Sequence, residues 1–267
     1  MEKSFFSRLH GAMMQNVGTE DVLQTAYGLP SDRAYDAVIV APAWTPEKLL
    51  KHTPAKITPV VEMSVCRTYE IEFEGRRLAW VQTGTGAGNV IDIALSLAGS
   101  AAKQVIFVGS VGALDPEIRI GEIATPSHSV AGDGASLYLY ETIDPANFFR
   151  RVPQGKQSLD ALQRAAQAAG VEVRVRPVYC VDAVTCEYHH MPQIRSFGCE
   201  LIEMETAAFM RCMELSGKKY AVLLCVSDNS AAGAHLVGRS EEDRLRYWEA
   251  RERHIPRLIL ELTKEQE

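Results

Sequence analysis

Acidic residues stand directly after two apolar segments, where a carboxyl group can do chemistry. Glu203 and Glu205 flank Met204 in "LIEMET", and Asp228 follows Ser227 at the end of the apolar run in "AVLLCVSD". A carboxylate there can accept hydrogen bonds from the vicinal hydroxyls of a sugar, with the Met204 thioether against the ring. A protonated carboxyl can act as the acid for a leaving group. Two simpler interpretations stay open: acids favour a helix N-terminus, and Ser-Asp begins a turn.

Two glycine-rich segments follow predicted strands and can bring the backbone close to a ligand. "TGTGAG" (83–88) lacks the G-x-G-x-x-G spacing, and no acid ends the next strand about 20 residues later, which argues against a dinucleotide cofactor. A tight turn for helix packing and a ligand-facing loop both remain open. In "VIFVGSVGAL" (105–114) we expect the strand to end at Gly109. The Ser110 hydroxyl then lies at a strand terminus, where ligands of α/β sheets bind.

The composition favours a globular protein with a small-molecule ligand. The 267 residues are 46% hydrophobic, and 28 Lys and Arg stand against 34 Asp and Glu, a net charge of −6. This argues against a nucleic-acid or membrane-surface binder. Six cysteines show no CxxC pair and no zinc spacing, so no metal site is predicted. Because no signal-peptide pattern or long apolar span is present, we expect a cytoplasmic protein with reduced cysteines.

Strand and helix patterns alternate along the chain. Apolar runs predict strands at 36–42, 69–73, 77–83, 104–110, 122–130, 172–181 and 219–227. Helical spacing predicts helices at 88–99, 157–169 and about 240–264, and Gly75 marks a hairpin turn. We predict an α/β fold with a mixed central sheet flanked by helices on both faces, in three layers. One domain would cover 1–267, with 1–35 as an N-terminal extension, and the loop at 131–156 is a candidate for function or subunit contact.

Four segments, in this order and spacing, resemble the nucleoside phosphorylase and nucleosidase superfamily. Its members include uridine phosphorylases, hexameric purine nucleoside phosphorylases, and methylthioadenosine and AMP nucleosidases. The segments are "TGTGAGNVIDIALSL", "VGSVGALDPEIRIGEIATP", "IEMETAAFM" and "LLCVSDNS", of which the third is the most specific, and the resemblance covers roughly residues 36 to 260. It implies cleavage of the N-glycosidic bond of a nucleoside without a cofactor.

The resemblance also implies roles for individual residues. Glu205 would hold the ribose 2′ and 3′ hydroxyls, and Met204 would pack on the sugar. Asp228 would protonate the purine nitrogen of the five-membered ring as the base leaves, supported by Arg244 or Arg239. The remaining residues that would contact the substrate are Ser110, Val111, Gly112, Val184, Ile202, Glu203 and Ser227.

The resemblance leaves the nucleophile open. Phosphate would be held by Ser110, Gly86 and Arg67, and relatives with the "DGASL" element are mostly phosphorylases, so phosphorolysis is the first expectation. However, Phe107 and Pro46 stand near the places of two phosphate-binding arginines, and neither forms charge-assisted hydrogen bonds. Hydrolysis by water is therefore the alternative. A nucleoside-binding protein without turnover is the third interpretation.

Two further expectations concern the base and the assembly. Asp228 favours a purine, because uridine phosphorylases resemble the chain at "DGASLYLYE" but lack this acid; a pyrimidine stays open. The family implies a homo-oligomer, either a dimer or a hexamer. His10 would then reach the ribose site of a neighbouring subunit, although a simple surface position is equally open.

Overall fold

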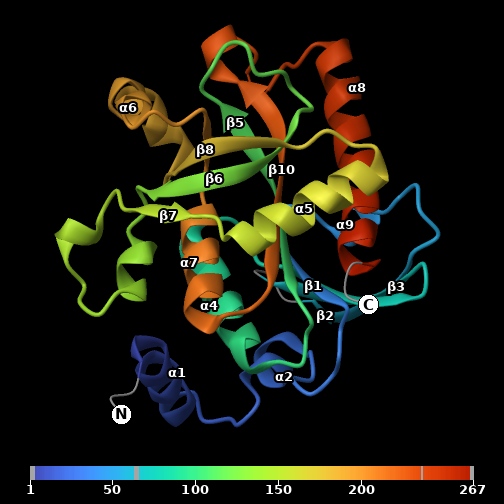
Figure 1. Cartoon of the computed structure of the whole chain (residues 1–267), viewed down its shortest axis with the longest axis vertical. Coiled ribbons are helices and arrows are strands. Elements are labelled where there is room, and N and C mark those ends of the chain that lie inside the picture. The colour runs from blue at the N-terminus through green and yellow to red at the C-terminus, as the bar shows by residue number, and fades with distance from the viewer. Residues whose placement is uncertain (1–3, 63–65, 236, 265–267) are drawn as a thin grey trace.

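One part of the sheet contains the predicted hairpin. The computed structural model describes residues 4–62, 66–235 and 237–264. β1 (Ala37–Ala41) lies parallel to β4 (Arg76–Gln82), β4 pairs antiparallel with β3 (Arg67–Phe73), and β3 pairs with β2 (Lys56–Glu62) (Figure 1). The β3–β4 turn has positive φ at Glu74 (49°) and Gly75 (76°), as a two-residue type I′ turn requires. The predicted hairpin is confirmed.

The other part of the sheet closes on itself. β5 (Val105–Ala113) pairs with β10 (Tyr220–Asn229), β10 with β6 (Ile123–Ala131), β6 with β8 (Arg174–Cys180), and β8 with β9 (Leu201–Glu203), which returns to β5. β7 (Arg151–Pro153) adds to β6, and β1 joins the two parts by pairing with β5. The mixed sheet is as predicted. The closure was not predicted, and a register shift in β6, between Pro126 and Ser129, bends the strand that completes it.

β5 is longer than the sequence predicted. It continues from Val105 to Ala113, so Gly109 and Gly112 lie inside a strand and not in a turn. A Cβ on Gly109 would lie 3.0 Å from Cε1 of Phe107. Glycine within a strand often marks such a close approach, and here it allows a bulky ring beneath the strand.

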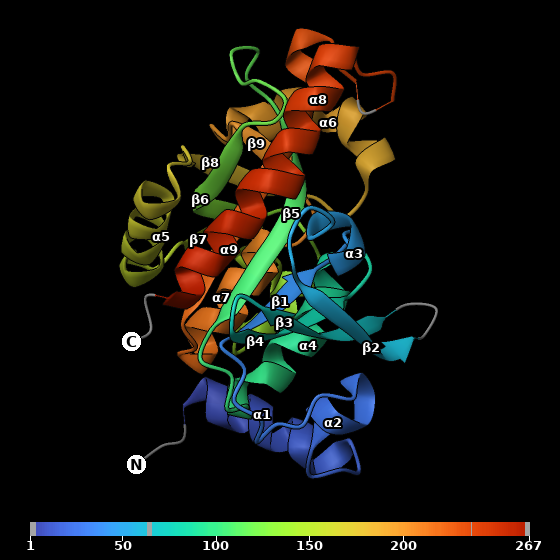
Figure 2. The ribbon, with the colours of Figure 1, turned by 90° about the vertical axis from the view of Figure 1, so that its right-hand side faces the viewer.

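Helices cover both faces of the sheet, which confirms the three-layer arrangement (Figure 2). α4 (Ala87–Ser96) and α7 (Thr206–Ser216) pack together on one face, in the same apolar core as Phe107. α5 (Lys156–Ala169) and α9 (Ile255–Lys264) pack together on the other, with Ile106 and Val108. Because side chains alternate along a strand, β5 contributes to both cores.

Several helices that were not predicted from the sequence lie at the ends of the molecule. α1 (Phe5–Asn16) and α2 (Val22–Tyr27) lie at the end that holds the N-terminus, and α6 (Val184–Ser196) lies at the opposite end (Figures 1 and 2). The predicted C-terminal helix consists of α8 (Glu241–Glu249), a π-helical turn and α9. The shorter helical segments are α3 (Pro46–Leu49) and 3₁₀ turns at Leu97–Gly99, Ala135–Leu139, Pro145–Asn147 and Ser230–Ala232.

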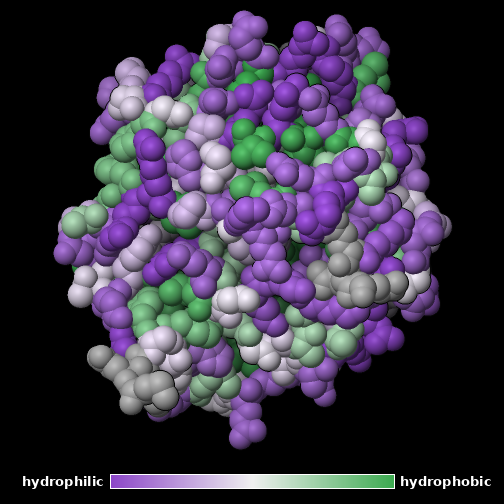
Figure 3. All heavy atoms as spheres, viewed as in Figure 1, coloured by the Kyte–Doolittle hydropathy of each residue, from purple (hydrophilic) through white to green (hydrophobic). Residues whose placement is uncertain are grey.

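The surface is mixed in character. The face in Figure 3 is mainly hydrophilic, with smaller hydrophobic areas between the polar side chains. Three exposed hydrophobic residues, Tyr138, Ile143 and Phe149, belong to the segment that was predicted as a long loop. Within the part of the chain that the structure describes, no helix combines the length and apolar character needed to cross a membrane.

Candidate active site

A cavity of about 240 Å³ lies where β5, β9 and β10 end, beside the first turn of α6. Strand termini of this kind are the usual ligand sites of α/β sheets. Predicted residues from four separate segments meet there. Those that line the cavity are Ser110, Val111, Gly112, Val184, Ile202, Glu203, Met204, Glu205, Ser227 and Asp228.

A β-bulge directs two consecutive polar side chains toward the cavity. Val226 and Asp228 pair with consecutive residues of β5, so Ser227 is an extra residue in β10. Successive side chains of a regular strand point to opposite faces, and a bulge interrupts this alternation. Both Ser227 and Asp228 therefore line the cavity, and the Ser227 hydroxyl donates to Oδ1 of Asp228 at 2.6 Å.

Gly112 allows Asp228 to approach β5. A Cβ at Gly112 would lie 3.2 Å from Oδ2 of Asp228 and 3.2 Å from Cγ2 of Ile202, which is tighter than most side-chain contacts. Burial raises the pKa of Asp228 above its ordinary value, although the Ser227 hydrogen bond acts in the opposite direction. The carboxyl therefore keeps a proton to a higher pH than a solvated aspartate would, which suits an acid catalyst.

Glu203 has a structural task at the cavity wall. Its Oε2 accepts the backbone N–H groups of Glu205 (2.7 Å) and Thr206 (2.8 Å), and its Oε1 accepts the Thr206 hydroxyl (2.7 Å) and the Cys180 thiol (2.8 Å). Glu203 thus caps α7 and connects it to β8. The helix-terminus interpretation, which the sequence left open, agrees with these hydrogen bonds, and contact of Glu203 with the base stays a prediction.

Glu205 is held by the glycine-rich turn before α4. The backbone N–H of Gly86 donates to Oε1 of Glu205 at 2.6 Å. Gly86 has a φ of 104°, which glycine adopts far more readily than other residues. Burial, and then the charge of Glu203, raises the pKa of Glu205 well above its ordinary value. The segment "TGTGAG" therefore orients a buried carboxyl group in the wall of the cavity.

Glu187 is a cavity residue that the sequence analysis missed. It lies on the first turn of α6, is 8% exposed, and lines the cavity together with Val184 and Tyr188. Burial, and then the charge of Asp228, raises the pKa of Glu187 to about 7. The available signal was that Glu187 is the only acid in 184–196 and stands one turn after Val184. Pro192 and the scattered polar residues hid the helix.

The cavity carboxyl groups form two pairs. The charge of Glu203 raises the pKa of Glu205, and the charge of Asp228 raises that of Glu187. We call Glu203 and Glu205 the bonded pair, because backbone N–H groups donate to both. We call Glu187 and Asp228 the open pair, because among the described residues only Ser227 donates a hydrogen bond to either carboxyl.

No basic side chain of the described residues lines the cavity. Phe107, which the resemblance places near a phosphate-binding arginine, is 1% exposed, and its ring centroid lies 5.2 Å from that of Phe209 in α7. Pro46 is buried at the first position of α3. With these two places apolar, the lining is acidic, which favours hydrogen-bond donors and disfavours anions.

Three predicted contacts lie outside the cavity wall. Gly86 bonds to Glu205 but does not itself line the cavity. Arg67 is exposed on β3, opposite Gln82 of β4. His10 packs within its own chain, its ring 5.7 Å from that of Phe6, at the opposite end of the molecule from α6 (Figure 2). Their expected roles toward phosphate and toward a neighbouring subunit stay predictions.

The structure distinguishes the two arginines proposed to support Asp228. Arg244 is exposed on α8 and lines a separate hollow with Leu245 and Trp248, so the choice of Arg244 is not supported. Arg239 is close enough for its positive charge to lower the pKa of Asp228. Its guanidinium lies 4.5 Å from the centre of the Tyr247 ring, which holds it beside the strand end.

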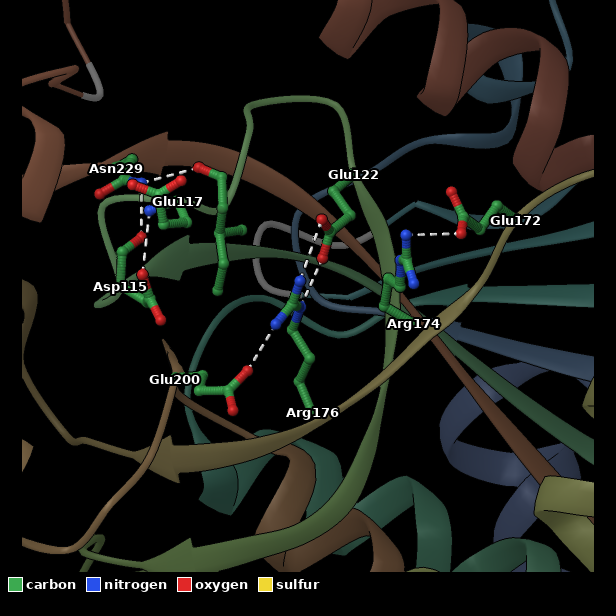
Figure 4. A network of polar contacts seen from close by, with 9 residues as sticks. Asp115, Glu117, Glu122, Glu172, Arg174, Arg176, Glu200 and Asn229 are labelled. Carbon is green, nitrogen blue, oxygen red and sulfur yellow. Dashed lines mark hydrogen bonds and ion pairs between the residues drawn. The ribbon is translucent and has the colours of Figure 1, made fainter.

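A polar network fixes the strands around the site (Figure 4). Arg176 of β8 donates to Glu122 and to Glu200, which precede β6 and β9. The side-chain amide of Asn229 donates to the carbonyl groups of Asp115 (2.8 Å) and Ile118 (2.7 Å). The end of β10, one residue after Asp228, is thus tied to the connection between β5 and β6.

The described residues contain no group of three or more His, Cys, Asp or Glu side chains arranged to hold a metal ion.

Sequence comparison gives relatives at low identity. A DeoD-type purine nucleoside phosphorylase from an Exiguobacterium species is 24% identical over 175 residues, 64% of this chain and 70% of the relative. A 5′-methylthioadenosine/S-adenosylhomocysteine nucleosidase from a Marinomonas species is 25% identical over 184 residues, 65% of this chain and 78% of the relative.

Structural comparison agrees with the sequence comparison. The crystal structure of uridine phosphorylase from Vibrio fischeri aligns with a TM-score of 0.69 and 21% identity, over 88% of this chain and 94% of that one. This likeness shows the fold. Residues 36–259, most of the chain, match the family model described as the phosphorylase superfamily. The family contains both phosphorylases and nucleosidases that act on nucleosides, and the chain belongs to it.

Proposed function

We propose that this protein is an enzyme that cleaves the N-glycosidic bond of a purine nucleoside, with water as the nucleophile. The observation that carries the choice of water is the charge of the cavity. The bonded and open pairs line it, and no basic side chain of the described residues does. Orthophosphate is an anion that requires charge-assisted donors, whereas water and a neutral nucleoside do not.

The two carboxyl pairs suggest how the nucleoside would be oriented. The pentose would lie at the bonded pair, where Glu205 accepts hydrogen bonds from its vicinal hydroxyls and Met204 packs against the ring. The base would lie at the open pair, with Asp228 against its five-membered ring. Ser110 of β5, which also lines the cavity, would contact the sugar. The family resemblance of "IEMETAAFM" and "LLCVSDNS" supports the same orientation.

In this orientation Asp228 would act as the general acid. As the C–N bond breaks, the pentose develops oxocarbenium character and the base gains negative charge, which a proton from Asp228 neutralises. Water then forms the new C–O bond at the anomeric carbon. The proton that this water loses restores the acid, so the products are a free base and a free pentose.

Phosphorolysis is the second candidate function. Arg67 favours it, because this exposed side chain lies opposite Gln82, at the end of β4 that leads into the glycine-rich turn. The DeoD-type relative is also named a phosphorylase. In this case the product would be the pentose 1-phosphate.

The identity of the sugar product tests the proposal. Inosine, adenosine and uridine are incubated with the purified protein, with and without phosphate, and the sugar is identified. We expect free ribose from a purine nucleoside at rates that phosphate does not change. Ribose 1-phosphate formed only with phosphate would establish phosphorolysis instead. Binding without any turnover would indicate a nucleoside-binding protein. Asp228→Asn, purified in parallel, controls for contaminating enzymes.

A further inference from the structure

α6 directs a carboxyl group toward the cavity. Of its thirteen residues only Glu187 and Ile194 are buried, and they lie seven positions apart, on the same face of the helix. Ile194 packs in a small apolar cluster with Leu114 and Tyr179. Glu187 lines the cavity instead. The helix thus covers one side of the cavity and presents an ionisable group there.

The Glu187 carboxyl has an unmet capacity for hydrogen bonding. It is 8% exposed, and no described residue donates a hydrogen bond to it. Burying a carboxylate without donors is unfavourable, and the charge of Asp228 makes it more so. A ligand that supplies a donor at this place would remove the penalty. The structure therefore favours a ligand group that donates a hydrogen bond between α6 and β10.

We infer that Glu187 determines base specificity by accepting a hydrogen bond from the amino group of a 6-aminopurine, so that adenine nucleosides are preferred over 6-oxopurine nucleosides. This inference rests on the proposed function. Asp228 would face N7 of the purine, and the substituent on C6 lies on the same edge of the ring as N7. Glu187 lines the same cavity as Asp228, on the side formed by α6, and this places its carboxyl group where it can meet the substituent.

The chemistry of the substituent decides the preference. An amino group donates to a carboxylate and forms a charge-assisted hydrogen bond. An oxo group is an acceptor, and against a carboxylate it would add a second unpaired acceptor to a buried site. Discrimination of this kind, in which a site's polar group is left unpaired by the wrong ligand, is stronger than discrimination by shape alone.

Paired kinetic measurements test the inference. The ratio of kcat/KM for adenosine to that for inosine is measured at pH 8, above the pKa of about 7 of Glu187, for the wild type, Glu187→Gln and Glu187→Ala. We expect the wild type to favour adenosine by about 10–100-fold. Glu187→Gln should reduce the ratio most, because its amide N–H can donate to the 6-oxo group. Glu187→Ala should bring the ratio near unity. Glu172→Gln makes the same chemical change at an exposed residue paired with Arg174 and should leave the ratio unchanged (Figure 4).

Calorimetric binding of free adenine and hypoxanthine to the wild type provides a second readout that needs no turnover and no variant. Tighter binding of adenine supports the inference, and equal binding, tighter binding of hypoxanthine or no binding overturns it. Turnover with an unchanged ratio in both variants would overturn the role of Glu187 while the proposed function stands. If no nucleoside is cleaved, the proposed function fails and the binding result decides the inference by itself.

Discussion

The bonded pair and the open pair lie in one cavity but are built differently. Glu203 and Glu205 belong to the junction of β9 and α7, and backbone N–H groups from α7 and from the turn before α4 donate to them. Among the described residues, only Ser227 donates a hydrogen bond to the open pair, and it donates to Asp228. The wall beside the bonded pair is the central core, whereas the wall beside the open pair is the largely exposed α6.

The difference suits a cavity that binds one constant part and one variable part of its ligand. Donors fixed by the backbone hold the bonded pair in one geometry before any ligand arrives, which suits the pentose, a constant part of every nucleoside. The open pair keeps hydrogen-bonding capacity that the protein does not satisfy, which suits the base, the part that varies. If this comparison holds, changes at the two pairs should have separable effects on rate, sugar binding and base choice.

Asp228→Asn should have the largest effect. The amide is nearly the same shape but cannot donate the proton that the leaving base needs, so we expect kcat to fall by about 10²–10⁴-fold. Sugar binding should change little, because the bonded pair is intact. Steady-state kinetics with a purine nucleoside measure this change. A variant with full activity would remove Asp228 from its proposed role.

Glu205→Gln tests the bonded pair. The side-chain oxygen can still accept the Gly86 N–H, but the other oxygen is replaced by an amide nitrogen, which cannot accept from a pentose hydroxyl. We expect kcat/KM to fall by about 10–100-fold, with base choice unchanged. The wild-type preference for a ribonucleoside over its 2′-deoxy analogue should also shrink. An equal preference in wild type and variant would contradict the pentose contact.

Gly112→Ala tests how closely Asp228 must approach β5. The added Cβ would lie 3.2 Å from both Oδ2 of Asp228 and Cγ2 of Ile202, so one of them must move by a few tenths of an ångström. We expect a loss in kcat of about 10-fold, below the roughly 10²-fold that a 1 Å displacement can cause.

Gly11→Ala is the matched control for Gly112→Ala. Gly11 lies within α1, and nothing would lie within 4 Å of its added Cβ. The Gly11→Ala substitution should leave kcat unchanged. It should raise the free energy of unfolding by at most about 1 kcal/mol, because alanine favours the helix more than glycine does. If the two variants behave alike, the crowding at Gly112 has no catalytic consequence.

The bonded pair and half of the open pair were predictable from the sequence, because their signals are local. Glu205 and Asp228 directly follow apolar runs, and strand ends meet at one edge of a sheet. The dual character of Glu203 was also visible, since an acid at a helix start suits either a cap or a ligand. The hydrogen bonds show the cap, and the ligand contact stays a prediction.

The place of Glu187 and the surroundings of the two candidate arginines were not predictable, because they depend on tertiary placement. α6 has a weak amphipathic pattern, and the contact of its single acid with the cavity depends on how the helix sits beside β10. Arg239 and Arg244 are both plausible by spacing from Asp228. In the structure Arg239 packs on Tyr247 and its charge lowers the pKa of Asp228, which makes it the better candidate, and its support of Asp228 stays a prediction. The closure of the sheet likewise follows from pairings that no local pattern encodes.

Glu187→Gln should also change stability, separately from its effect on base choice. The pKa of Glu187 is about 7 in the folded chain against an ordinary value of 4.5, so the carboxyl is protonated in both states at low pH. As the pH rises from 4.5 to 7, the unfolded state releases its proton first, and the free energy of unfolding of the wild type decreases. Glutamine does not titrate. The variant should therefore match the wild type near pH 4.5 and exceed it by about 1–3 kcal/mol at pH 8, in urea unfolding. The control Glu172→Gln should show no such gain in stability. If Glu187→Gln instead loses stability at pH 8, the Glu187 carboxylate already has a partner that it requires.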